Sequence, residues 1–144
     1  MATTSLSNNF RKGLLVGNYD MDSDTINMAL YNVSSHDQNT GAYTTTNEAA
    51  GAGYTAKGVV MSGVVQATDT TNHVSHLDWT TNPSWATSTI TATDCMIFDE
   101  SATSPAVDAS CYIGDFGGSK SSSAGTFSVI LPAAAFNTSI IRLA

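Results

Sequence analysis

The segment "GDFGGSKSSSAGTF", residues 114–127, links two apolar stretches and contains four glycines and four serines. A phosphate-binding loop would need a Gly-Lys pair that opens a helix, but Lys120 follows Ser119, and the next residues, "GTFSVIL", are β-branched and aromatic. The Asp-Phe-Gly triplet at 115–117 also occurs in protein kinases, whose other motifs are missing here. We therefore interpret the segment as a turn between two strands, with the Gly-Gly pair at the turn.

Outward from this turn, short stretches of alternating polarity predict further strands. In "TINMALYNV", residues 25–33, Ile26, Met28 and Leu30 share one face. The other strands are expected at residues 56–68 (with Gly63 as a possible bulge), 73–80, 89–100, 109–116, 125–132 and 139–143, and loops at 34–53 and 81–88. About seven short strands separated by turn residues predict a mainly β fold, a single jelly-roll-like β-sandwich.

The N-terminal region is expected to differ from the rest. Residues 1–9 are small and polar, which is typical of a flexible arm, and residues 10–144 would form the sandwich domain. In "NNFRKGLLVG" the spacing of Phe10 and Leu14 predicts one short helix, with Asn8 or Asn9 as N-cap and Gly17 as its end.

Composition and charge exclude several functions. The chain of 144 residues has 42% hydrophobic and 12% charged residues and a net charge of −7. Its five basic residues are scattered, so neither a nucleic-acid surface nor a polybasic membrane patch is expected. No apolar run reaches the roughly 18 residues of a membrane helix, and the N-terminus lacks a signal-peptide pattern. We therefore expect synthesis in the cytoplasm and no contact with a membrane.

The carboxylates of "DMDSDT", residues 20–25, begin like a calcium loop. The loop would need glycine at its sixth position and glutamate at its twelfth, where Thr25 and Tyr31 stand. A solvated acidic turn between helix and strand is the better interpretation.

Nothing in the sequence predicts an enzyme, a metal site or a cofactor. His73 and His76 would point to opposite faces of a strand, and His36 stands alone in a loop. Asp99 and Glu100 are adjacent at a strand end, so they too would face opposite ways. No nucleophile signature surrounds any serine or cysteine.

Cys95 and Cys111 lie in consecutive predicted strands. A hairpin centred on Thr103 would place them opposite each other, within reach of a disulfide. Two buried thiols are the favoured interpretation, and the disulfide stays open as the alternative.

The order of several segments resembles a family of small virion proteins of tailed bacteriophages and prophages. These segments are "DTINMALYN", "TNEAAGAGYTAKGVV", "WATSTITATDCMIF", "IGDFGGSKSSSAGTFSVILP" and "SIIRLA". The family has similar "GTGYTAGG", "TITARGALIY", "DFGG.....GTF" and "AIIRL" elements in this order. The resemblance covers roughly residues 24–144, and its most specific parts are residues 53–56, 89–92 and 115–127.

This resemblance implies a structural role, most like that of capsid cement or decoration proteins. Such a protein would bind the exterior of the capsid of the virion. Its partners would be the major capsid protein and copies of itself, as a homodimer or homotrimer. Candidate contact residues are Phe10, Arg11, Trp85 and Phe136.

Two alternatives remain. One is another position in the virion, as a tail, baseplate or head-fibre component. The other is a different class of β-sandwich protein: a carbohydrate-binding module, which would need exposed aromatic residues, or a small hydrolase, which would need a polar cluster. The chain departs from the family pattern at Lys57, where glycine is usual, and at Thr93-Asp94, which replaces an Arg-Gly pair.

Overall fold

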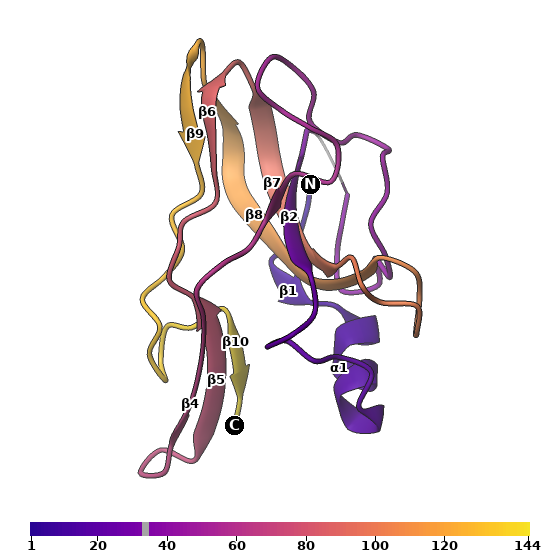
Figure 1. Cartoon of the computed structure of the whole chain (residues 1–144), viewed down its shortest axis with the longest axis vertical. Coiled ribbons are helices and arrows are strands. Elements are labelled where there is room, and N and C mark those ends of the chain that lie inside the picture. Colours follow the sequence, from indigo (N-terminus) through magenta and orange to yellow (C-terminus); the bar gives the residue numbers. More distant parts are fainter. Residues whose placement is uncertain (33–34) are drawn as a thin grey trace.

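The computed structural model describes residues 1–32 and 35–144, and within them the protein is mainly β, as predicted (Figure 1). Val33 and Ser34, at the junction of a predicted strand and a predicted loop, lie outside the described residues. The described residues form one helix and ten strands in three antiparallel sheets. This arrangement is consistent with a β-sandwich, whereas the eight-stranded, two-sheet pattern of a jelly roll is not confirmed.

The largest sheet has the strand order β1-β8-β7-β2-β3. Its strands are β1 (Ser5–Leu6), β2 (Ile26–Tyr31), β3 (Val59–Val60), β7 (Thr91–Asp99) and β8 (Ala109–Ser121). The hairpin of β7 and β8 is its longest element, and these two strands run through the middle of the molecule (Figure 1).

Two smaller sheets lie at opposite ends of the molecule (Figure 1). The three-stranded sheet has the order β10-β5-β4, from β4 (Val64–Asp69), β5 (Val74–Trp79) and β10 (Ile141–Leu143). The two-stranded sheet pairs β6 (Ser84–Ser88) with β9 (Gly125–Ser128). The chain therefore crosses between the ends several times, which brings segments far apart in sequence together.

Strand β2, between β7 and β3, is buried on both faces. Ile26, Met28 and Leu30 belong to the main hydrophobic cluster, so the predicted shared face is confirmed. Ala29 and Tyr31 belong to a second, smaller cluster on the other face of the sheet, with Met96, Phe98, Ile113 and Ala2. A strand with hydrophobic side chains on both faces needs other segments packed against both sides of the sheet. The alternation of residues within the strand does not show which segments these are.

Helix α1 (Asn8–Val16) confirms the predicted helix, with its cap one residue earlier than expected. The Ser7 hydroxyl accepts a hydrogen bond from the N–H of Phe10 at 3.0 Å, and the helix ends at Gly17, whose φ is +73°. A serine N-cap satisfies a backbone donor that the helix leaves unpaired.

The expectation of a flexible arm over residues 1–9 is corrected by this structure. Ser5 and Leu6 pair with Ile113 and Tyr112 of β8, and Ala2 and Ser7 are buried. The N-terminal residues are polar but short, and they gain backbone hydrogen bonds by completing the edge of the five-stranded sheet.

Three predicted boundaries were wrong. Residues 84–88 form β6 instead of a loop, and the predicted strand 56–68 is divided between β3 and β4, which belong to different sheets. The Gly-Gly pair lies inside β8, with φ of +67° at Gly117 and +141° at Gly118, where the register against β7 shifts. The turn itself follows β8, between Ser121 and Gly125.

Both cysteines are buried free thiols, as favoured, but the proposed register was wrong. Cys95 lies opposite Gly114, and Cys111 falls at an irregularity in the pairing of β7 and β8. Burial raises the pKa of the Cys95 thiol to about 12, which makes it a poor nucleophile.

Candidate functional site

The three segments most specific to the resemblance meet at one end of the molecule. We call residues 53–56, 89–92 and 115–127 the motif patch. The N–H of Thr89 bonds to the carbonyl of Ala52 at 2.9 Å, beside the first segment. The N–H of Ala124 bonds to the Thr89 hydroxyl at 3.1 Å, and Ala92 pairs with Lys120. In the sequence these segments are more than 20 residues apart, so only the tertiary structure brings them together.

A row of aromatic rings supports the motif patch from inside. The ring centroid of Tyr54 lies 6.0 Å from that of Trp85, which lies 6.1 Å from Phe127. Phe116 extends the row, 6.5 Å from Phe127. Such offset and edge contacts stabilise a cluster beyond the burial of its area. The patch therefore rests on a packed base, even though its own sequence is rich in glycine and serine.

The outer surface of the motif patch is neutral and polar. Its exposed residues are threonine, serine, alanine and glycine apart from Lys120. A shallow hollow of about 430 Å³ lies beside it, lined by Phe116, Phe127 and the exposed Ile130 among others. This surface can bind a partner by shape and short polar contacts, with few charges to desolvate.

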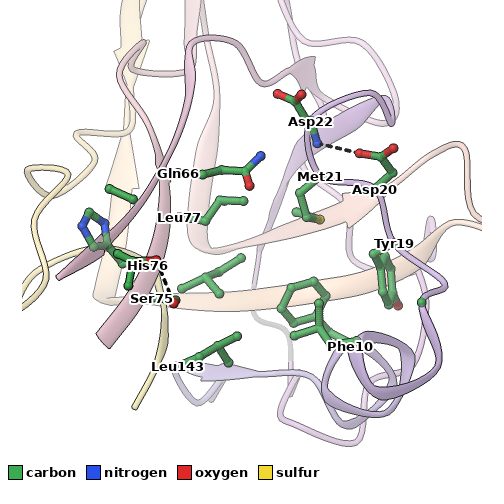
Figure 2. A pocket seen from close by; sticks show the side chains of 15 residues that line it. Phe10, Tyr19, Asp20, Met21, Asp22, Gln66, Ser75, His76, Leu77 and Leu143 are labelled. Carbon is green, nitrogen blue, oxygen red and sulfur yellow. Dashed lines mark hydrogen bonds between the residues drawn. The ribbon is translucent and has the colours of Figure 1, made fainter. Parts of the chain in front are cut away.

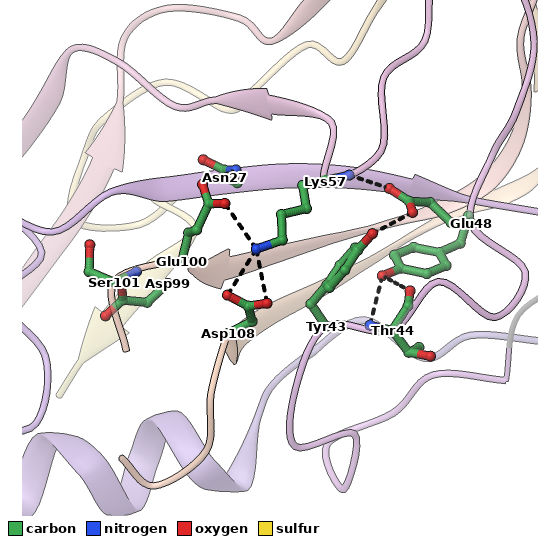
Figure 3. Close-up of polar contacts among 10 residues, drawn as sticks. Asn27, Tyr43, Thr44, Glu48, Lys57, Asp99, Glu100, Ser101 and Asp108 are labelled. Carbon is green, nitrogen blue, oxygen red and sulfur yellow. Dashed lines mark hydrogen bonds and ion pairs between the residues drawn. The ribbon is translucent and has the colours of Figure 1, made fainter. Parts of the chain in front are cut away.

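A polar network around Lys57 holds the preceding loop in place (Figure 3). The Glu48 carboxylate accepts hydrogen bonds from the Tyr43 hydroxyl (2.6 Å), the Tyr54 hydroxyl (2.9 Å) and the Lys57 N–H (2.7 Å). The Lys57 ammonium donates to Glu100 at 2.9 Å and pairs with Asp108 at 3.0 Å, and these bonds raise its pKa. The network joins the loop that contains Tyr54 to the turn between β7 and β8.

This network gives the Lys57 side chain a structural role. Lys57 has a φ of +71°, in the left-handed region where glycine is favoured. A lysine at this position carries backbone strain, but it gains the two carboxylate contacts that a glycine could not make. Glu48 was missed in the sequence because it stands alone, nine residues before Lys57, in a stretch without periodicity.

A serine, a histidine and an aspartate come together between β5 and β10, but not as a nucleophilic centre. The Ser139 hydroxyl lies 3.0 Å from Nδ1 of His76. The Asp78 carboxylate accepts hydrogen bonds from the N–H groups of Trp79 (2.8 Å) and Ile140 (3.2 Å). Ser139 is buried, so its hydroxyl is not presented to a substrate. The group therefore ties the C-terminal strand to β5.

The acidic residues 20–24 form a turn, as interpreted from the sequence. Asp24 accepts a hydrogen bond from the N–H of Asp20 at 2.7 Å, and Asp20 accepts one from the N–H of Asp22 at 3.3 Å. Across residues 1–32 and 35–144, no group of three or more His, Cys, Asp or Glu is placed to hold a metal ion.

Asp99, buried beside this turn, should make stability depend on pH. Burial, and then the neighbouring Asp24, raise the pKa of Asp99 to about 6, and its carboxylate accepts the N–H of Ser101 at 2.7 Å. A raised pKa means that the folded state holds this proton more tightly than the unfolded state. The corresponding stability is therefore present at acidic pH and lost as pH rises from the ordinary value of 3.8 to about 6.

We expect Asp99→Asn to raise the free energy of unfolding at pH 7 by about 1–2 kcal/mol, because the amide keeps an acceptor and needs no ionisation. Urea denaturation at pH 4 and pH 7 measures this gain, which should shrink at pH 4. Asp69→Asn is the control. Asp69, which is half-buried, has a lowered pKa because of its bonds to Asn72, so its replacement should give no gain. An equal gain for both variants would contradict the assignment to Asp99.

A second surface feature is a groove of about 910 Å³ at the other end of the molecule (Figure 2). Phe10, Tyr19 and Met21 line one wall, from α1 and the acidic turn. Leu77 and Leu143, from β5 and β10, line the opposite wall. The groove is the open side of the main hydrophobic cluster, where the helix and the small sheet do not close on each other.

The four predicted contact residues divide into two kinds. Phe10 and Trp85 are 1% and 3% exposed, which corrects their assignment as contact residues, because neither side chain is accessible. Arg11 and Phe136 are exposed, so both side chains are accessible to a partner. Both tryptophans, Trp79 and Trp85, are buried, so neither offers a platform for stacking a sugar ring.

Comparison with family models, with curated proteins and with solved structures found no match to this chain. Over the described residues, none of the helical structure is long and apolar enough to cross a bilayer.

Proposed function

We propose that this chain is a structural protein of a tailed-phage virion, a cement protein that binds the outside of the capsid and stabilises contacts between capsomers. The observation that carries the proposal is the convergence of the motif patch. Segments 53–56, 89–92 and 115–127 carry the resemblance, and they lie together on one surface. If the three segments form one binding surface, a common function would explain why all three resemble the same family. Segments scattered over the molecule would give no such explanation.

The chemistry of the motif patch suits a repeated, low-affinity contact. Its exposed hydroxyl and methyl groups cost less to desolvate than charged groups would, and Ile130 offers an apolar contact beside the hollow. On a capsid, many copies would bind identical positions, so that weak contacts add up over the shell. The major capsid protein is the proposed partner of this surface.

The test uses particles assembled by the phage that encodes this chain, with and without the chain. Adding back purified protein should restore binding, measured by co-sedimentation, and should raise the temperature at which filled particles release DNA. Ile130→Asp should weaken binding by about tenfold or more, since it puts a charge into an apolar contact. Val107→Asp is the matched control, because Val107 is 68% exposed in the turn between β7 and β8, at the other end of that hairpin.

The same particles separate the alternatives. If the protein is found on isolated tails or baseplates and not on heads, it is a component of the tail. Equal binding of Ile130→Asp and wild type would remove the motif patch as the docking surface.

A further inference from the structure

The outer face of helix α1 presents an apolar and basic surface that nothing in the fold covers. Leu15 and Val16 are 88% and 64% exposed, and Arg11 and Lys12 are exposed on the same side of the helix. Within the part of the chain that the structure describes, neither basic side chain forms an ion pair. The face therefore combines two large hydrophobic side chains with two of the five basic residues of the chain.

The groove beside α1 has the complementary character. Its walls are apolar where Phe10, Met21 and Leu77 line it, and Leu143 is 51% exposed at its edge. Its charged lining consists of Asp20 and Asp22, with no lysine or arginine. Both carboxylates lie on the turn at one rim of the groove (Figure 2). An apolar, anionic groove thus occurs in the same chain as an apolar, cationic helix face.

We propose that the protein self-associates by seating the Arg11–Val16 face of one copy in the groove of a second copy. Leu15 and Val16 would fill the apolar floor, and Arg11 and Lys12 would lie against Asp20 and Asp22 at the rim. Charge complementarity selects this occupant, because the groove would repel a chain that shared the net charge of −7 unless it presented a basic face.

The contact joins two different surfaces, so one copy can offer its helix while another offers its groove. It uses the end of the molecule opposite the motif patch (Figure 1). Self-association would therefore leave the motif patch accessible, and the proposal does not depend on what that patch binds.

The experiment measures the molar mass of the full chain by light scattering and sedimentation, from about 1 μM to about 1 mM, which covers weak to moderate affinities. Wild type should associate, and more weakly as salt increases. Leu15→Gln on the helix face and Leu143→Lys in the groove, which removes an apolar side chain and adds a charge that repels Arg11 and Lys12, should each weaken association by at least about tenfold. Ile130→Asp, 74% exposed beside the motif patch, is the control and should associate like wild type.

Mixing gives the sharpest test. Leu15→Gln keeps an intact groove and Leu143→Lys keeps an intact helix face, so an equimolar mixture should form a one-to-one complex that neither variant forms alone. If Leu143→Lys lowers the melting temperature, Gln66→Arg replaces it, because Gln66 is exposed in β4 at the groove and the new charge would repel Arg11 and Lys12. A monomeric wild type at the highest concentration, a normal association of either variant, or a mixture without a complex would each overturn the proposal.

Discussion

Replacing Gly58 with alanine is expected to destabilise the fold by about 3–5 kcal/mol, among the largest effects of any single substitution in this chain. A Cβ at this position would lie 1.8 Å from the carbonyl oxygen of Met28 and 2.9 Å from the Cα of Ala29. Both obstacles are backbone atoms of β2, which is buried on both faces, so they cannot move aside. Gly58 also has a φ of +71°, which alanine adopts only with strain.

The matched control is Gly17→Ala. Gly17 has nearly the same φ, +73°, but no atom lies within 4 Å of the point that an alanine Cβ would occupy there. This variant carries the conformational cost alone, about 1 kcal/mol. Urea denaturation of both variants measures the difference. If Gly58→Ala and Gly17→Ala lose similar stability, the close approach of residue 58 to β2 is not the reason for a glycine at position 58.

Deletion of residues 2–7 is expected to lower the free energy of unfolding by about 3 kcal/mol or more. The deletion removes the N-cap of α1, for which about 1 kcal/mol is typical, and the pairing of β1 with β8. It also removes Ala2 from the second hydrophobic cluster and the bond from the Ser7 hydroxyl to the carbonyl of Ser110 at 2.6 Å. Thermal unfolding of the shortened and full chains measures the loss.

The single substitution Ser7→Ala is the companion to this deletion. It removes the helix cap and the buried hydroxyl bond but leaves β1 in place, so it should account for only part of the loss. If the shortened chain melts at the same temperature as the full chain, residues 2–7 do not stabilise the fold, and the interpretation of a flexible arm from the polar sequence would be correct.

The candidate site was partly accessible from sequence. The acidic turn and the buried thiols follow from the sequence, which also contains each segment of the motif patch. The convergence of these segments does not follow from the sequence, because it depends on pairs such as Ala92 with Lys120, which the chain separates by 28 positions. Pro83 and the small polar residues around Trp85 suppress the strand pattern and predict a loop there, although the Trp85 ring is buried against Phe127.

The groove and the Lys57 network could not be inferred before the structure. Each combines side chains from elements far apart in the chain, and their spacing in the sequence does not indicate that they lie together. Leu143 meets Phe10 across the groove only because β10 pairs with β5 on the side of the helix.

What the sequence determined by itself is the local pattern of this protein. The alternation of Ile26, Met28 and Leu30 marks β2, Gly17 ends the helix, and few helical stretches compete with the strands. These features follow from side-chain geometry within a few residues, so they can be read without knowing what lies nearby. The same holds for the low charge, which limits the kinds of partner.

Only the tertiary structure decided which strands pair and which segments bury each face of the sheet. It pairs residues 5 and 6 with β8, buries both faces of β2, and places the Gly-Gly pair inside a strand instead of at a turn. Each outcome depends on contacts between residues far apart in the chain, where the gain from burial and backbone hydrogen bonding outweighs local preference. The small, polar segment 2–7 and the segment 115–121, with its Gly-Gly pair, have weak local preferences, and there the non-local contacts decided the conformation.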